Sequence, residues 1–137
     1  MPTFQNAREN YVQSPIFFRR KIIFSENGIV SLGFVAAQSV IRGGEIAVRT
    51  AFNSGTLNTI SVGLRFIDGT TQPAVYTSAQ SLTTPGIVNF NAMATSAFVY
   101  TDVDAELIAT INQTGTASTT GEAYILVNAI SRMGRRL

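Results

Sequence analysis

Two runs of apolar and β-branched residues in the last third of the chain restrict its fold more than any other feature. They cover residues 103–112 and 122–130, and a small, polar, glycine-punctuated connection at 113–121 separates them. Runs of this length and composition are typical of β-strands, and a polar connection that contains glycine is typical of a hairpin loop. The sequence therefore predicts a β-hairpin with a longer loop in this region.

Both faces of these two expected strands are apolar, because side chains alternate along a strand. One face carries Leu107, Ala109, Ile111, Ala123, Ile125, Val127 and Ala129. The opposite face carries Ile108, Tyr124, Leu126 and Ile130. A strand that is apolar on both faces lies at the centre of a sheet and is covered on both sides. A second copy of so short a chain would supply the second cover, so we expect this opposite face to mediate self-association.

Similar short segments recur along the rest of the chain at about ten-residue spacing. Strands are expected at 16–24, 29–37, 45–52, 60–66, 74–76, 87–91 and 98–100. Turns are expected at 25–28, 42–44, 53–55, 68–69 and 84–86, and Gly33 is expected to break or bulge its strand. No segment shows a convincing helical period. The pattern predicts an all-β fold, either an antiparallel β-sandwich or a jelly roll.

The 137 residues suit a single domain. Residues 1–15 have no clear period, and their aromatic side chains Phe4 and Tyr11 favour an extended arm that packs on a partner over a frayed terminus. We expect the sandwich to occupy residues 16–131. Residues 132–137 then form a basic carboxyl-terminal tail.

Positive charge is concentrated near both ends of the chain, and the body between them is mildly acidic. The basic residues of the two ends are Arg8, Arg19, Arg20, Lys21, Arg132, Arg135 and Arg136. Basic ends suit docking onto an acidic partner surface or nucleic acid, and simple solubility is the alternative. The triplet at 19–21 interrupts an apolar strand, so we expect it to guard a sheet edge. It lacks the exposed aromatic platform of single-strand readers, so nucleic acid is not the expected partner.

The composition removes most catalytic chemistry. The chain has no Cys and no His, which excludes thiolate chemistry and a conventional nucleophile–histidine pair. We expect neither an enzyme nor a small-molecule substrate, and no cofactor. Asp102, Asp104 and Glu106 alternate and would share a face of a strand, where they could hold a cation such as Ca²⁺. The alternative is a solvated turn before a strand.

The start of the chain lacks a charged segment followed by an apolar one, as a secretory signal would require. No run approaches the ~20 apolar residues that span a bilayer. We therefore expect synthesis in the cytoplasm and no membrane partner.

Four segments together resemble a known group of proteins. They cover residues 33–41, 46–55, 60–63 and 115–127. Their sequence style is similar to that of small structural proteins of tailed-bacteriophage virions, especially capsid cement (decoration) proteins. The resemblance implies a β-sandwich, a homotrimer, and a place on the capsid surface where subunits of the major capsid protein meet. It implies no catalytic residues.

These observations predict a virion structural protein without enzymatic activity, namely a capsid cement protein that binds and stabilises the shell of major capsid protein. The residues expected to face the capsid are Phe4, Arg8, Tyr11, Phe17, Arg19, Arg135 and Arg136. One alternative is a tail, fibre, baseplate or head–tail connector component of a virion. Another is a carbohydrate-binding β-sandwich module.

Overall fold

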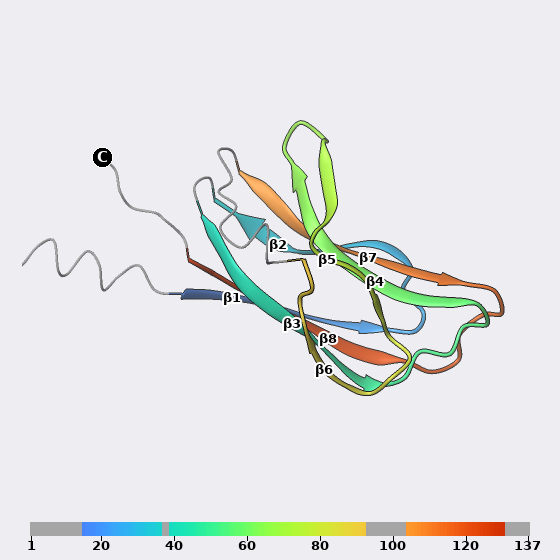
Figure 1. Cartoon of the computed structure of the whole chain (residues 1–137). Coiled ribbons are helices and arrows are strands. Elements are labelled where there is room, and N and C mark those ends of the chain that lie inside the picture. The colour runs from blue at the N-terminus through green and yellow to red at the C-terminus, as the bar shows by residue number, and fades with distance from the viewer. Residues whose placement is uncertain (1–14, 37–38, 93–103, 131–137) are drawn as a thin grey trace, which may run out of the picture.

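The computed structural model describes residues 15–36, 39–92 and 104–130. Strands joined by turns and loops make up this part of the chain, and it contains no helix (Figure 1). The strands form two four-stranded antiparallel sheets that pack face to face. Their bounds are β1 Pro15–Ile23, β2 Gly28–Val35, β3 Val40–Thr50, β4 Leu57–Phe66, β5 Thr71–Ser81, β6 Gly86–Asn89, β7 Ala105–Thr114 and β8 Glu122–Ile130.

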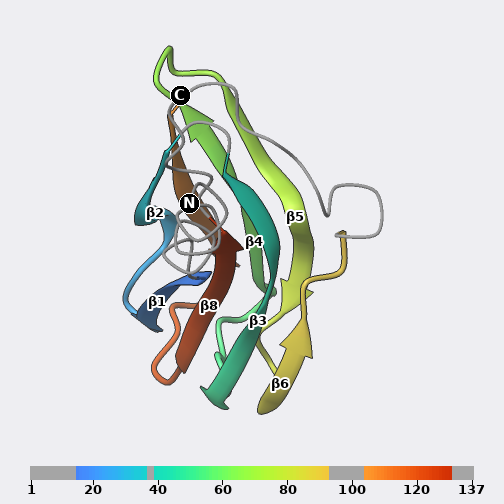
Figure 2. The same ribbon diagram turned by 90° about the vertical axis from the view of Figure 1, so that its left-hand side faces the viewer.

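The strand order identifies the fold as a jelly roll. One sheet has the order β1-β8-β3-β6 and is called here the β8 sheet; the other has the order β2-β7-β4-β5 and is called the β7 sheet. Figure 2 shows the strands of the β8 sheet side by side in that order. Every connection between consecutive strands crosses to the opposite sheet, except the turn between β4 and β5. Two four-stranded sheets wound in this way make up a jelly roll, which confirms the predicted fold class.

The core lies between the two sheets and consists of alternate residues of each strand. On β4 the inward residues are Ile60, Val62 and Leu64, all fully buried as their alternation predicts. The inward faces of β7 and β8 are also buried, and both strands lie at the centre of their sheets. Burying an aliphatic side chain of this size contributes ~1.5–3 kcal/mol, so these alternating positions supply the main stabilisation of the sandwich.

The predicted hairpin between β7 and β8 is wrong. The two strands belong to different sheets, and the loop at 115–121 carries the chain from one sheet to the other. Asn53 fixes this loop: its Oδ1 accepts hydrogen bonds from the backbone N–H groups of Thr119 (2.8 Å) and Thr120 (3.1 Å) and from the Ser118 hydroxyl (2.9 Å). Each strand pairs instead with strands that are distant in sequence, namely β8 with β1 and β3, and β7 with β2 and β4.

The turn predicted at 42–44 is also wrong, because these residues lie inside β3. The register with β8 shifts between Ile41 and Gly43, so the glycines accommodate a β-bulge and the strand continues. A Cβ atom on Gly44 would overlap the ring of Phe90 and the carbonyl oxygen of Leu126. The residue at this position must therefore be glycine, because Phe90 and the β8 backbone leave no room for a side chain. The bulge predicted at Gly33 is confirmed by a register shift between Ser31 and Gly33.

Strand β5 is longer than the sequence indicated and is strongly irregular. A strand was expected only at 74–76, whereas β5 covers eleven residues. Its register with β4 moves from Val62↔Thr77 to Leu64↔Gln72, so the β5 backbone bulges at this point. Ala79, at a second shift, has a φ of 48°, in the left-handed region that alanine rarely adopts. The strand expected at 98–100 and the tail at 132–137 lie outside the described residues. So do residues 1–14 of the arm expected at 1–15, whose last residue, Pro15, begins β1.

Candidate functional site: the outer face of the β8 sheet

The outer face of the β8 sheet begins on β1, where alternation turns Phe17, Arg19 and Lys21 away from the core. Phe17 is 69% exposed, whereas the neighbouring Phe18 packs against the core. The register places these residues beside outward residues of β8: Phe17 beside Asn128, Arg19 beside Leu126 and Lys21 beside Tyr124. The face therefore combines apolar and cationic side chains in adjacent rows.

Tyr124 lies at the centre of the charged part of this face. The Arg19 guanidinium lies 5.0 Å from the centroid of its ring, within the range of a cation–π contact. The Tyr124 hydroxyl donates a hydrogen bond of 2.9 Å to Glu122, which also forms ion pairs with Lys21 (3.6 Å) and Arg49 (3.7 Å). The Tyr124 hydrogen bond and then the two cations hold the pKa of Glu122 below its ordinary value. One carboxylate is therefore shared by two cations.

The structure brings together residues that the sequence assigned to two different surfaces. Phe17 and Arg19 were expected to face a capsid, whereas Tyr124 and Leu126 were expected to join copies of the chain. All four lie on one face, and Arg19 pairs with Leu126 and contacts Tyr124. Ile130 ends β8 at the other end of the same face, paired with Pro15 and Val40.

The other predicted site residues do not join this face. Ile108 lies on β7, in the other sheet, and is 0% exposed within the single chain. The role of Ile108 in self-association stays a prediction. Phe4, Arg8, Tyr11, Arg135 and Arg136 lie outside the described residues.

Sequence reasoning missed three contributors to the face. From the sequence, Lys21 was treated only as part of a basic triplet. Its spacing of two residues from Arg19 would have predicted that both side chains share one face of the strand. Arg49 joins the cluster only because the fold places β3 beside β8. Ile87 on β6 is 67% exposed, and a shallow hollow of about 310 Å³ lies along Phe17, Gly43, Glu45 and Leu126. No local pattern in the sequence indicated this hollow, since it depends on the glycine bulge of β3.

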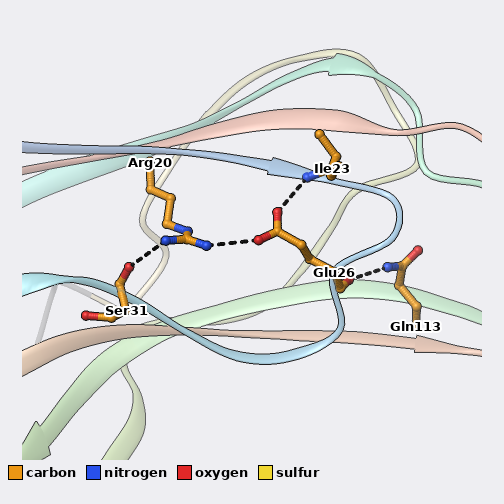
Figure 3. Close-up of polar contacts among 5 residues, drawn as sticks. All are labelled: Arg20, Ile23, Glu26, Ser31 and Gln113. Atoms are coloured by element: carbon orange, nitrogen blue, oxygen red, sulfur yellow. Dashed lines mark hydrogen bonds and ion pairs between the residues drawn. The ribbon is translucent and has the colours of Figure 1, made fainter.

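Arg20, the middle residue of the basic triplet, has a structural role (Figure 3). Its guanidinium donates hydrogen bonds to the Ser31 carbonyl oxygen (3.3 Å) and to Glu26 (2.9 Å). Glu26 also accepts a hydrogen bond from the Ile23 N–H (2.9 Å), and its carbonyl oxygen accepts one from Gln113 (2.8 Å). This network joins the edge strands β1 and β2 along one side of the sandwich. Only Arg19 and Lys21 of the triplet face outward.

A second apolar patch, which the sequence did not indicate, lies at one end of the β7 sheet. Phe34 is 75% exposed and Ile67 is 82% exposed, and both line a hollow of about 710 Å³. The hollow is also lined by Arg65 and Glu106, which form an ion pair of 2.7 Å. Hydrogen bonding from Ser31, and then from Arg65, holds the pKa of Glu106 below its ordinary value.

The described residues contain no group of three His, Cys, Asp or Glu side chains that could hold a metal ion. Of the acids considered as cation ligands, Glu106 is engaged by Arg65 and Asp102 lies outside the described residues. Within the same part of the chain, no helix has the length and apolar character needed to cross a membrane.

The strand order and the two packed sheets place the chain in the class of jelly-roll β-sandwiches. No protein-family model and no curated protein sequence matches it. Among solved structures it is similar to a chain of the capsid of Ralstonia phage GP4, with a TM-score of 0.61 and 15% identity over 88% of this chain and 85% of that one. It is similar to a chain of the cyanophage Pam1 capsid asymmetric unit, with a TM-score of 0.60 and 9% identity over 86% and 85%.

A third similar structure is a chain of the acidic stable capsid of Helicobacter pylori bacteriophage KHP30, with a TM-score of 0.52 and 15% identity over 83% of this chain and 86% of that one. At these identities the likeness establishes the fold. In all three cases it extends over most of both chains, so it concerns the sandwich as a whole.

Proposed function

We propose that this protein is a structural component of a phage virion, without enzymatic activity, and that it acts as a capsid cement protein. The observation that carries the proposal is the likeness in fold and length to chains of three phage capsids. The absence of Cys and His is consistent with a binding role.

We further propose that the outer face of the β8 sheet binds the major capsid protein. Phe17 supplies exposed apolar area, and burial of an aromatic side chain contributes ~1.5–3 kcal/mol. Arg19, Lys21 and Arg49 supply positive charge, and exposed ion pairs contribute only ~0–1 kcal/mol each. Apolar contacts therefore supply most of the affinity, and the charges select an acidic surface and orient the encounter.

The terminal segments attach beside this face. Pro15 at the start of β1 pairs with Ile130 at the end of β8, so the segments that carry Phe4, Arg8, Tyr11, Arg135 and Arg136 begin at the same end of the sheet. We propose that these residues extend the capsid contact. A homotrimer would bind several shell subunits at once, and its contacts would add through effective concentration. A protein that binds the assembled shell but not its free subunits stabilises the shell by mass action.

The first experiment measures copy number in purified particles. A cement protein is present in hundreds of copies, whereas a tail, fibre, baseplate or connector component is present in a few to tens. Hundreds of copies would support the proposal, and a few to tens would replace it with the tail-associated alternative. Binding of the isolated protein to glycans, without binding to capsids, would favour the carbohydrate-binding alternative.

The second experiment measures binding to empty capsids by co-sedimentation at low and high salt. Phe17→Ser combined with Arg19→Gln should weaken binding strongly, and Phe34→Ser is the matched control because Phe34 is a similarly exposed phenylalanine on the other sheet. Deletion of residues 2–14 should weaken binding and leave the sandwich folded, since β1 begins at Pro15. Binding that none of these changes reduces would contradict the assignment of this face.

A further inference from the structure

The open edge of β1 is a candidate docking site for an extended chain. Strand β1 is one of the two edge strands of the β8 sheet, and among the described strands it pairs only with β8. In an antiparallel pair, the backbone groups of successive residues point alternately toward the partner strand and away from it. The Phe24 N–H donates to the Gly121 carbonyl oxygen (3.1 Å), on the β8 side, and the Ile23 N–H donates to the Glu26 side chain (2.9 Å), on the open side.

This alternation assigns the backbone groups of the whole strand. The odd-numbered residues Phe17, Arg19 and Lys21 direct their N–H and C=O groups to the open edge. Within the described part of the chain, none of these groups has a backbone or side-chain partner. Unpaired edge groups of this kind are a template for one more strand.

The side chains beside this edge are cationic on the outer face. Arg19 and Lys21 alternate there, and both are exposed. Lys21 lies 3.6 Å from Glu122, beyond hydrogen-bond distance, and Arg49 shares the same carboxylate at 3.7 Å. Because Arg49 remains to balance Glu122, the Lys21 ammonium can pair with an incoming carboxylate without leaving Glu122 unpaired.

Charge decides which chain can occupy the edge. Pairing of two β1 strands would set the Arg19 and Lys21 side chains of one copy beside those of the other, and like charges on facing strands are destabilising. A strand with acidic side chains opposite these two residues, and an apolar side chain opposite Phe17, is complementary at all three positions.

We propose that the open edge of β1 binds an extended acidic segment of a partner protein as a fifth strand of the β8 sheet. The inference deepens the proposed function, since on a virion the partner segment would belong to the shell. Cross-strand pairs place acidic side chains beside Lys21 and Arg19 and a leucine-sized side chain beside Phe17. Main-chain hydrogen bonds from the odd-numbered residues of β1 provide affinity, and the side chains provide selectivity.

The test uses a fluorescein-labelled peptide, acetyl-Ser-Glu-Thr-Glu-Thr-Leu-Ser-amide, which places Glu, Glu and Leu opposite Lys21, Arg19 and Phe17. Fluorescence anisotropy with the full-length protein should give saturable binding that weakens as salt rises. The peptide with Gln in place of both Glu residues should bind about fivefold to thirtyfold more weakly, because it loses two exposed ion pairs. Lys21→Gln should weaken binding up to about fivefold.

Backbone methylation separates strand addition from charge attraction. N-methyl groups on the two Glu residues remove N–H groups that would bond to β1, so affinity should fall about tenfold or more. N-methyl groups on the two Thr residues remove N–H groups that point away, and this matched peptide should bind within about twofold of the parent. The inference would be overturned if the two methylated peptides bound equally well. It would also be overturned if the Gln peptide bound as tightly as the parent peptide, or if the parent peptide did not bind.

The outcome is separable from the proposed function. Capsid binding without peptide binding would overturn the strand-addition inference and leave the cement role standing. Peptide binding without capsid binding would support the edge site and contradict the cement role.

Discussion

The guanidinium of Arg19 on β1 lies 5.0 Å from the ring centroid of Tyr124 on β8. A residue expected to face a shell and a residue expected to join two copies of the chain therefore form one contact. The same side chains cannot be buried against a shell and against a second copy of the chain at the same time. Its assignment to the shell makes the question of self-association testable by substitution.

We expect a homotrimer in solution, seen by light scattering as three times the chain mass at micromolar concentration. If the outer face of the β8 sheet binds the shell, Leu126→Asp should leave the trimer intact and abolish capsid binding. Phe34→Asp, on the exposed patch of the other sheet, should leave capsid binding intact. A monomeric wild-type protein would contradict the trimer. A monomeric Leu126→Asp variant would indicate that Tyr124 and Leu126 mediate self-association.

Acid should destabilise the fold through Glu106. Its pKa is below the ordinary value of 4.5 in the folded protein, so the unfolded chain binds more protons as pH falls through that range. The stabilisation is therefore complete above the ordinary pKa and is lost as pH falls through the lowered folded value. Thermal melting at pH 3–7 should show a falling Tm on the acid side, and Glu106→Gln should flatten the profile. Glu45→Gln is the control, because Glu45 forms no ion pair within the described residues.

The Tyr76 hydroxyl should be dispensable for stability. Tyr76 is fully buried, its hydroxyl has no hydrogen-bond partner in the described structure, and burial raises its pKa well above the ordinary value. An unpaired buried hydroxyl is costly, so Tyr76→Phe should raise the free energy of unfolding by about 1 kcal/mol. Tyr124→Phe removes a hydroxyl that is bonded to Glu122 and should lower it by about 1 kcal/mol. Urea denaturation measures both, and a destabilised Tyr76→Phe variant would refute the expectation.

Backbone strain at Ala79 should be relieved by glycine. Ala79 has a φ of 48°, and left-handed conformations cost non-glycine residues ~1–2 kcal/mol. Glycine loses more conformational entropy on folding, so the net gain from Ala79→Gly should be about 0.5–1 kcal/mol. The converse control is Gly69→Ala, since Gly69 has a φ of 92° and a Cβ atom added there would meet no other atom within 4 Å. Gly69→Ala should destabilise the protein, and a destabilising Ala79→Gly would show that the alanine side chain contributes packing that outweighs the strain.

The sequence predicts the faces of the strands better than their partners. Ile60, Val62 and Leu64 on β4 alternate with polar or small residues, and burial follows that alternation. Alternation is a local property, however, and cannot indicate to which sheet a strand belongs. The expected β7–β8 hairpin failed for this reason, since a seven-residue crossing between sheets and a hairpin loop have the same composition.

The bulge at Gly33 was predicted, but the irregular features of β3 and β5 were not, because tertiary packing causes them. Gly43 and Gly44 have the composition of a turn, but the close approach of Phe90 and the register with β8 keep them in a strand. The candidate site was only partly predictable in the same way. Strand alternation singled out Tyr124 and Leu126, and the charge and aromatic residues near the amino-terminus singled out Phe17 and Arg19. Nothing in the sequence shows that β1 and β8 are neighbours.

The last strand of the jelly roll lies in the middle of a sheet, with consequences for synthesis. Strand β8 pairs with both β1 and β3, so a growing chain cannot assemble the β8 sheet until residue 130 is available. Until then β1 has no partner, and pairings over such long sequence separations form slowly. The face that we assign to the shell therefore exists only in chains that include β8. If the proposed function holds, a prematurely terminated chain would lack the docking surface and would not enter particles.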